Sequence, residues 1–363
     1  MTKLKFSLLA CAFVGSWISA QGQTAPLPAA AGEDPQGRVI KVAARIADEL
    51  AQLCPVADAA DQAAFDKCRS GLFRDSQFKR SLQSFVLWGR QRDPAVKLAD
   101  AKLTQFGPDV LAGMYVPLFM FNGQFSVNYV EREGLYQIRL ETAFRNGLTP
   151  GQFPYPFWHD SEKWGMYEKA NDLILWWDVK TDKVKVAQFT VFGAHPPIQA
   201  SAHVTPPKFD GQWRWTDAQG RSQPTVTVFD GLMRQDNPYL GKLDSAYKSL
   251  ALRLREGQCM DCHVPNNPDG MKRLVLLQTP MHAASEIKRV MDSVRKDRMP
   301  RDELGMENPL DPRTKEALLN EGAAFERLVD LAKRWEAGMS AAAPGDVKPM
   351  APTGKSDLTA SVR

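Results

Sequence analysis

The sequence predicts a multidomain protein with an all-α domain at the C-terminus, preceded by a short helical segment and an α+β domain with an antiparallel sheet. Its 363 residues exceed the length of one typical domain. Apolar residues alternate with polar ones between 106 and 236 and recur at helical spacing after 238. We expect a signal peptide over 1–20, a linker over 21–36, the helical segment over 37–105, the α+β domain over 106–238, the all-α domain over 239–338 and a disordered tail over 339–363.

The first residues have the pattern of an export signal. Lys3 and Lys5 precede an apolar stretch from Phe6 to Ile18, and small residues follow as far as Ala20. The stretch is shorter than the roughly 20 residues that cross a bilayer. We therefore expect cleavage after about Ala20, a periplasmic mature protein and no membrane span in the mature chain.

Charge indicates no nucleic-acid partner. The chain has 46 Lys and Arg against 42 Asp and Glu, a net charge of +4, and no block of basic residues.

The helical segment contains two cysteines at its helix ends. Periodicity predicts helices over 39–53 and 59–73, with Cys54 and Cys68 positioned to clamp them together. In an exported protein a structural disulfide is the default, and closing a loop of about 15 residues stabilises by about 3 kcal/mol. A redox-active pair is the alternative.

The α+β domain is expected to contain six or seven strands and one helix. We predict a strand over 135–144, hairpins joining 117–121 to 124–130, 172–179 to 184–192 and 212–216 to 225–229, and a helix over 160–170. Six of the nine tryptophans lie here, either as core or as the lining of a ligand pocket. Trp176 and Trp177 must point to opposite faces of a strand, so we expect one of them at an interdomain contact.

The most specific motif is Cys259-Met260-Asp261-Cys262-His263. Two thiols at this spacing can add to the two vinyl groups of one porphyrin, and the adjacent histidine then lies under the iron. A zinc site, a thioredoxin-like redox pair and a plain disulfide are the alternatives.

The flanking elements support the haem interpretation. A helix over 244–256 ends at Gly257 before the motif, a second helix opens at Thr279-Pro280, and Met299-Pro300 precedes a last helix over 311–338. This order resembles a class I c-type cytochrome domain. The resemblance implies one covalent haem c with thioethers at Cys259 and Cys262, proximal ligand His263 and distal ligand Met299, so that His263 and Met299 hold the iron. It also implies that the first and last helices cross closely at a small residue such as Gly322.

The sixth ligand has competitors. Met299 lies 36 residues after His263, in a loop stiffened by proline. Met271, Met281, His282 and Met306 are the other candidates, and the position could also be open.

One attachment motif means one haem. The sequence thus predicts an exported monohaem c-type cytochrome that transfers single electrons to or from an unidentified redox partner protein, an electron carrier with no catalytic residues of its own. The alternatives are a haem-containing sensor or small-ligand-binding protein that uses the aromatic α+β domain, and a haem enzyme with an open distal site.

Overall fold

The computed structural model describes residues 34–148, 166–194, 232–259, 262–263, 280–302 and 304–338. The expected signal peptide, linker and C-terminal tail lie outside these ranges. So do the strands expected over 212–216 and 225–229 and the first half of the helix expected over 160–170.

The centre of the fold is a six-stranded sheet with the strand order β2-β1-β6-β5-β4-β3. Its strands are β1 (Leu82–Arg90), β2 (Thr104–Phe106), β3 (Phe119–Val130), β4 (Leu135–Phe144), β5 (Asp172–Asp178) and β6 (Lys183–Thr190). Neighbouring strands are antiparallel except β1 and β6, which run parallel. The sheet is therefore mixed, and the expected purely antiparallel sheet is wrong.

Two strands of this sheet come from the segment expected to be helical. In β1 the buried residues are Leu82, Val86 and Trp88, whereas Phe85 is exposed. These buried residues lie on one face of the strand, but in the sequence the apolar residues of 85–88 are contiguous and do not show the alternation that reveals a strand. The strand β1 and its short partner β2 therefore escaped detection.

The strands β4, β5 and β6 were predicted correctly, but the hairpin predicted between 117–121 and 124–130 is wrong. Asn122-Gly123 does not turn the chain, because β3 continues through it with a register shift between Phe121 and Phe125. Gly123 has a φ of 83°, a left-handed conformation that glycine adopts without strain. The actual hairpin turn lies between β3 and β4 and ends at Gly134, whose φ is 63°.

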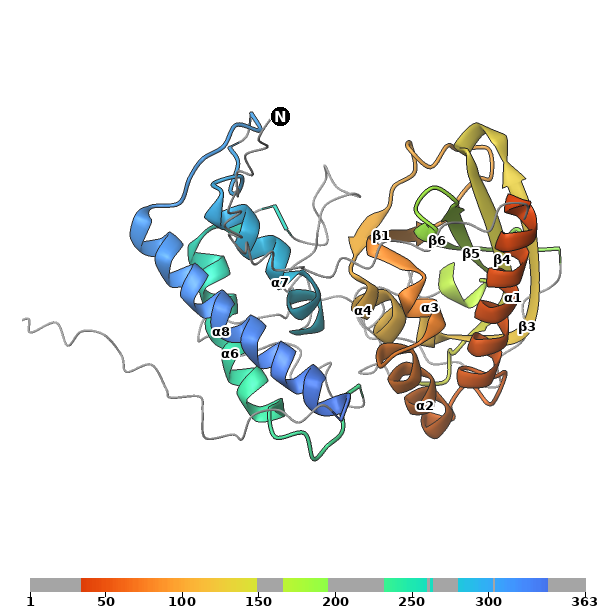
Figure 1. Cartoon of the computed structure of the whole chain (residues 1–363), viewed down its shortest axis with the longest axis horizontal. Helices are drawn as coiled ribbons and strands as arrows, with labels where there is room; N and C mark the ends of the chain where they lie inside the picture. Colours follow the sequence, from red (N-terminus) through yellow and green to blue (C-terminus); the bar gives the residue numbers. More distant parts are fainter. Residues whose placement is uncertain are drawn as a thin grey trace, which may run out of the picture. The chain divides into compact units, whose positions relative to one another are not determined.

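Short helices pack around the sheet (Figure 1). They are α1 (Pro35–Leu53), α2 (Gln62–Phe73), α3 (Gln77–Arg80) and α4 (Pro108–Val110), and α4 continues into the turns Leu111–Tyr115 and Val116–Leu118. Helix α1 buries one apolar face and packs on β3. Cys54, just after α1, forms a disulfide with Cys68 in α2, with the two Cα atoms 4.7 Å apart.

Both adjacent tryptophans of β5 are buried, on opposite faces of the sheet. Trp177 belongs to the main core, and Trp176 belongs to a smaller cluster with Leu103 and Ile174. The indole N–H of Trp176 donates to Gln188 Oε1 at 2.8 Å. The expected interdomain contact is wrong, because the connection between β1 and β2 covers this face.

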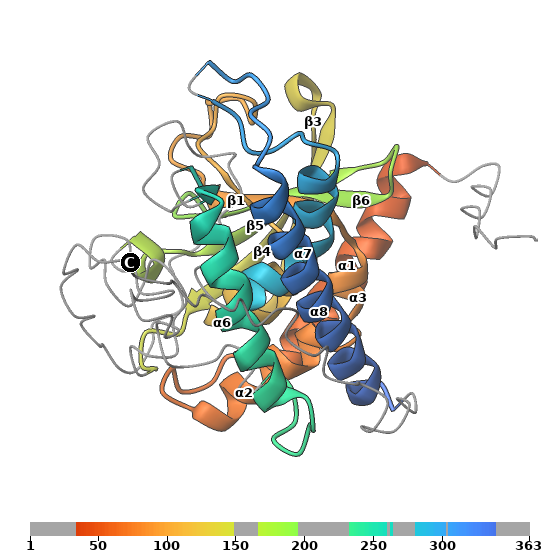
Figure 2. The same ribbon diagram turned by 90° about the vertical axis from the view of Figure 1, so that its left-hand side faces the viewer.

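Three helices follow the sheet: α6 (Leu240–Glu256), α7 (Pro280–Arg295) and α8 (Pro312–Glu336). Helix α8 packs against both α6 and α7 (Figure 2). Tyr247 of α6 and Phe325 of α8 meet with ring centroids 6.4 Å apart. Gly322 of α8 faces α7, since a Cβ there would lie 2.0 Å from Met291 Sδ. The close approach at Gly322 is thus with α7, not with the first helix as the resemblance implied.

The C-terminal region is helical, but the structure does not show the all-α cytochrome c domain that the sequence predicted. One continuous hydrophobic cluster contains residues of the sheet and of α6, α7 and α8. Arg289 of α7 lies over the Phe85 ring at 4.8 Å and donates to Gln105 Oε1 at 3.2 Å. The fold class is corrected to a mixed sheet with helices packed around it. The apolar face of α7 is wide enough to contact α8 on one side and α4 on the other.

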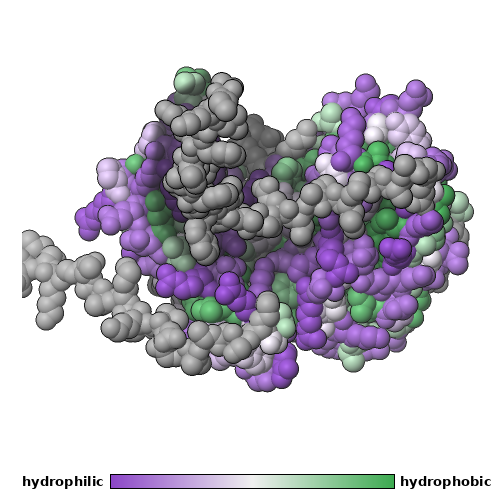
Figure 3. All heavy atoms as spheres, in the orientation of Figure 1, coloured by the Kyte–Doolittle hydropathy of each residue, from purple (hydrophilic) through white to green (hydrophobic). Residues whose placement is uncertain are grey.

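Hydrophilic side chains cover much of the described surface on the face seen in Figure 3, with apolar patches between them. Among the described helices, none is both long enough and apolar enough to cross a membrane.

Candidate functional site

The cysteine motif begins where α6 ends. The Gly257 amide donates to Arg253 O at 2.9 Å, which closes the last turn of the helix. Gln258 then adopts a φ of 58°, which breaks the helical path before Cys259. The sequence signal here, a glycine after a periodic run, located the end of α6 correctly.

Cys259, Cys262 and His263 lie on one short turn of the chain. The His263 amide donates to Cys259 O at 3.0 Å, a hydrogen bond of α-helical spacing. This hydrogen bond keeps the backbones of Cys259 and His263 within one turn, the spacing at which residues i, i+3 and i+4 can share one side of a helix.

The two cysteines are thiols and not a disulfide. Cys262 is exposed, and Cys259 is half-buried with its sulfur 3.7 Å from Gly257 O. An exposed thiol and a half-buried one can both be reached by a flat ligand lying against the turn. Among the described residues there is no cluster of three or more His, Cys, Asp or Glu suited to a bare metal ion.

Met299 lies at the start of a hairpin-like loop between α7 and α8. Asp302 Oδ1 accepts from the Leu304 amide at 3.0 Å and the Met306 amide at 2.8 Å. The Asn308 amide donates to Pro300 O at 3.0 Å. These bonds link the described residues of this loop, which we call the Met299 loop (residues 299–302 and 304–308).

Charge pairs connect the segment just before the Met299 loop with α7 and α8. Lys315 Nζ of α8 lies 2.6 Å from Asp297 Oδ1, just before the loop. Asp292 of α7 pairs with Lys296 at 2.9 Å and also with Arg298. The hydrogen bond from Lys296 is the main cause that lowers the pKa of Asp292.

The chain returns to the motif after the Met299 loop. A Cβ on Gly257 would lie 3.5 Å from Cys259 Sγ and 3.6 Å from Leu310 Cδ1. Leu310 thus packs beside the cysteine motif two residues after the loop closes. This contact brings the Met299 loop and the motif, which are far apart in sequence, into one region.

The competing sixth ligands are placed less favourably or lie outside the description. Met271 is not among the described residues, and for Met281 and His282 only the helical backbone of α7 is described. Met306 is 64% exposed at the far end of its loop, whereas Met299 is 38% exposed.

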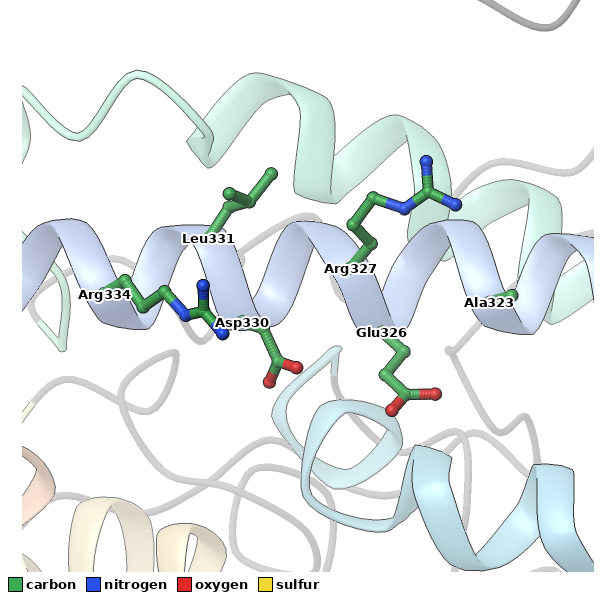
Figure 4. A pocket seen from close by; sticks show the side chains of 6 residues that line it. All are labelled: Ala323, Glu326, Arg327, Asp330, Leu331 and Arg334. Atoms are coloured by element: carbon green, nitrogen blue, oxygen red, sulfur yellow. The ribbon is translucent and has the colours of Figure 1, made fainter. Parts of the chain in front are cut away.

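A shallow pocket lies on the surface of α8 (Figure 4). Leu331 and Arg327 point toward α6, and Glu326 and Asp330 point toward α7. Lys288 of α7 lies 3.8 Å from Glu326 and 3.5 Å from Asp330. Because Lys288 already pairs with these carboxylates, the pocket offers a surface of balanced charge and no reactive group.

Comparison of the chain with protein-family models, with curated proteins and with solved structures found no match.

Sequence reasoning missed two buried ionisable residues. Glu286 of α7 is 2% exposed, and its Oε2 accepts from Arg289 at 2.8 Å while Oε1 has no hydrogen-bond partner in the described chain. Burial raises its pKa to about 7, although Arg289 acts in the opposite direction. Arg145, after β4, is fully buried. No sequence signal marks either residue, since charged residues in such positions are normally solvated.

Proposed function

We propose that this protein is an exported c-type haem protein that transfers single electrons to or from a partner protein. The observation that carries the proposal is the backbone hydrogen bond from His263 to Cys259, which keeps the motif within one turn, together with the thiol state of Cys259 and Cys262. Covalent haem attachment needs this donor set, whereas a disulfide would not need His263 and a zinc site needs more ligands.

The residues of the turn would divide the work of holding the haem. Each thiol, at Cys259 and at Cys262, would add across one vinyl group, its sulfur bonding to one carbon and its hydrogen to the other. His263 would ligate the iron as the proximal ligand. When bound, the haem supplies a one-electron redox centre whose potential depends on its ligands and surroundings.

Met299 is the proposed distal ligand. Its loop is held in a fixed shape by Asp302 and anchored to α8 through Asp297 and Lys315. Leu310 places the end of this loop beside Cys259. As the distal ligand, the Met299 thioether would leave the iron no open position and would favour electron transfer over ligand binding.

Export is part of the same proposal. The Cys54–Cys68 disulfide suits an oxidising compartment, and the basic and apolar pattern of the first 20 residues suits a cleaved signal peptide. The periplasm is the compartment that fits both features.

Optical spectra of the oxidised and reduced protein, produced in a host that matures c-type cytochromes, test the proposal. We expect a haem that remains attached after denaturation and a thioether-to-iron band in the oxidised state. Met299→Ala should abolish that band, and Met306→Ala is the matched control from the same loop.

Each result has a defined meaning. Loss of the band in Met306→Ala instead would move the distal ligand to Met306. A spectrum of wild type that shows an open position, and that changes with carbon monoxide, would contradict the electron-transfer proposal in favour of a sensor or an enzyme. A colourless protein would contradict it altogether.

A further inference from the structure

The side chain of Arg145 is a buried cation that has no hydrogen-bonding partner among the described residues. It follows the last residue of β4, and its side chain is 0% exposed. In the described part of the chain, none of its three guanidinium nitrogens has a hydrogen-bond partner. Burial lowers its pKa to about 10 against the opposing effect of Asp61, so the group is still charged at neutral pH.

The backbone holds Arg145 in this position. Its amide donates to Leu118 O at 2.7 Å. Two residues later Gly147 lies so close to the preceding turn that a Cβ would be 2.7 Å from Ala60 N. These contacts hold the backbone of this segment, which cannot shift toward solvent without breaking them.

Nearby negative charge is insufficient to pair Arg145. Asp61 is the acidic residue whose charge acts on it in the described chain, but the Asp61 side chain caps α2 by accepting from the Ala64 amide at 3.0 Å. Arg139 of β4, in contrast, is an arginine whose guanidinium has hydrogen-bonding partners. It donates to Asp172 at 2.9 Å and to Phe192 O at 2.9 Å.

A buried charge without partners is costly, and an anion that forms hydrogen bonds with it removes that cost. We propose that Arg145 anchors a binding site for a small organic carboxylate. The planar guanidinium can donate two parallel hydrogen bonds to the two oxygens of one carboxylate. Because one positive charge lies close to the negative charge of Asp61, a monoanion fits better than a doubly charged phosphate. This site lies next to the sheet and is independent of the proposed electron transfer.

Thermal unfolding of the haem-loaded full chain at constant ionic strength tests this proposal. The probes are acetate and benzoate, their neutral amides acetamide and benzamide, and inorganic phosphate. We expect the carboxylates to raise the unfolding temperature in a saturable manner, with about a 100-fold decrease in the unfolding constant at 100 times Kd. The amides should have no effect, and phosphate should act more weakly.

Variants assign the effect to the residue. Arg145→Met should abolish the carboxylate response, and Arg253→Met, an exposed arginine of α6, should keep it. Arg145→Lys keeps the charge but loses the planar fork, so it should need about tenfold more carboxylate. If Arg145→Met does not fold, the lysine variant and the comparison of carboxylates with amides decide the question.

The proposal would be overturned by no stabilisation by either carboxylate, by equal stabilisation by the amides or by phosphate, or by an unchanged response in the Arg145 variants. The haem absorption spectrum is recorded in the same titrations and should stay constant. A change in that spectrum would place the anion at the iron, which would also refute a site at Arg145. None of these results depends on whether Met299 ligates the iron.

Discussion

The buried carboxyl of Glu286 predicts how the stability of the protein changes with pH. Its pKa is about 7 in the folded protein against an ordinary value of 4.5, because burial disfavours the charged form more than Arg289 favours it. Between about pH 4.5 and pH 7 the unfolded chain loses this proton and the folded chain keeps it. The free energy of unfolding should therefore fall as the pH rises through this window and level off above it.

The size of the effect follows from the shift. A difference of about 2.5 pKa units corresponds to about 3.5 kcal/mol at most, using about 1.4 kcal/mol per unit. Glu286→Gln cannot ionise, so its stability should lack this part of the decline. Urea unfolding of wild type and variant at several pH values from 4 to 8.5 measures the difference.

An exposed glutamate provides the control for this experiment. Glu256→Gln changes an exposed glutamate that pairs with Arg253, and its pH dependence should run parallel to that of wild type. If the curve of Glu286→Gln also runs parallel to wild type, Glu286 is ionised throughout and the burial argument fails.

Three further predictions concern stability, each measured as the free energy of unfolding in urea. Replacing both Cys54 and Cys68 with alanine should cost about 3 kcal/mol, because the disulfide closes a loop of about 15 residues. Gly147→Ala should cost about 1–3 kcal/mol, because the new methyl group meets the backbone of Ala60 and not a flexible side chain. Asp109→Asn should cost about 1–2 kcal/mol at neutral pH and less in acid. Burial alone would raise the pKa of Asp109, but Lys333 and Lys79 outweigh it and hold that pKa below its ordinary value.

These three predictions have separate refutations. A double cysteine variant as stable as wild type would show that the bridge is not formed in solution. An unchanged Gly147→Ala protein would show that the turn has room to move. A loss in Asp109→Asn that stays constant down to pH 3 would exclude the loss of an ion pair as its cause.

The sequence predicted helices well where one apolar face was continuous. The periodic runs before Cys54, before Gly257 and after Pro312 correspond to α1, α6 and α8. Each of these helices buries a single regular stripe, which is the pattern that periodicity detects. The strands β4, β5 and β6 were also predicted correctly, because their apolar residues are dense and lie between turn residues.

The sheet topology could not be read from the sequence. The parallel pairing of β1 with β6 joins residues about 100 positions apart, and the apolar residues of β1 do not alternate in the sequence. The dipeptide Asn122-Gly123 is a strong turn signal, yet the pairing of β3 with β4 along almost its whole length overrides it. Local preference yields to long-range pairing at this position.

The sequence assigned the C-terminal helices to a separate domain because their order resembles a cytochrome c domain. In the structure, α7 also contacts residues of the sheet, since Arg289 lies over the Phe85 ring and donates to Gln105. The second buried side of α7 also explains Glu286, which lies against Gly107 where a Cβ would come within 2.9 Å of its carboxylate. In the candidate site, the sequence motif predicted Cys259 and His263 as site residues, and the structure adds the backbone hydrogen bond between them.

The most direct test of the account is the intact mass of the protein, produced with its signal peptide in a host that attaches haem, denatured before measurement. We predict a mass increase of one haem per chain, no alkylation at Cys259 or Cys262, and loss of the added mass when both cysteines are replaced by serine. A chain of unmodified mass whose two thiols react fully with an alkylating reagent would contradict the central claim.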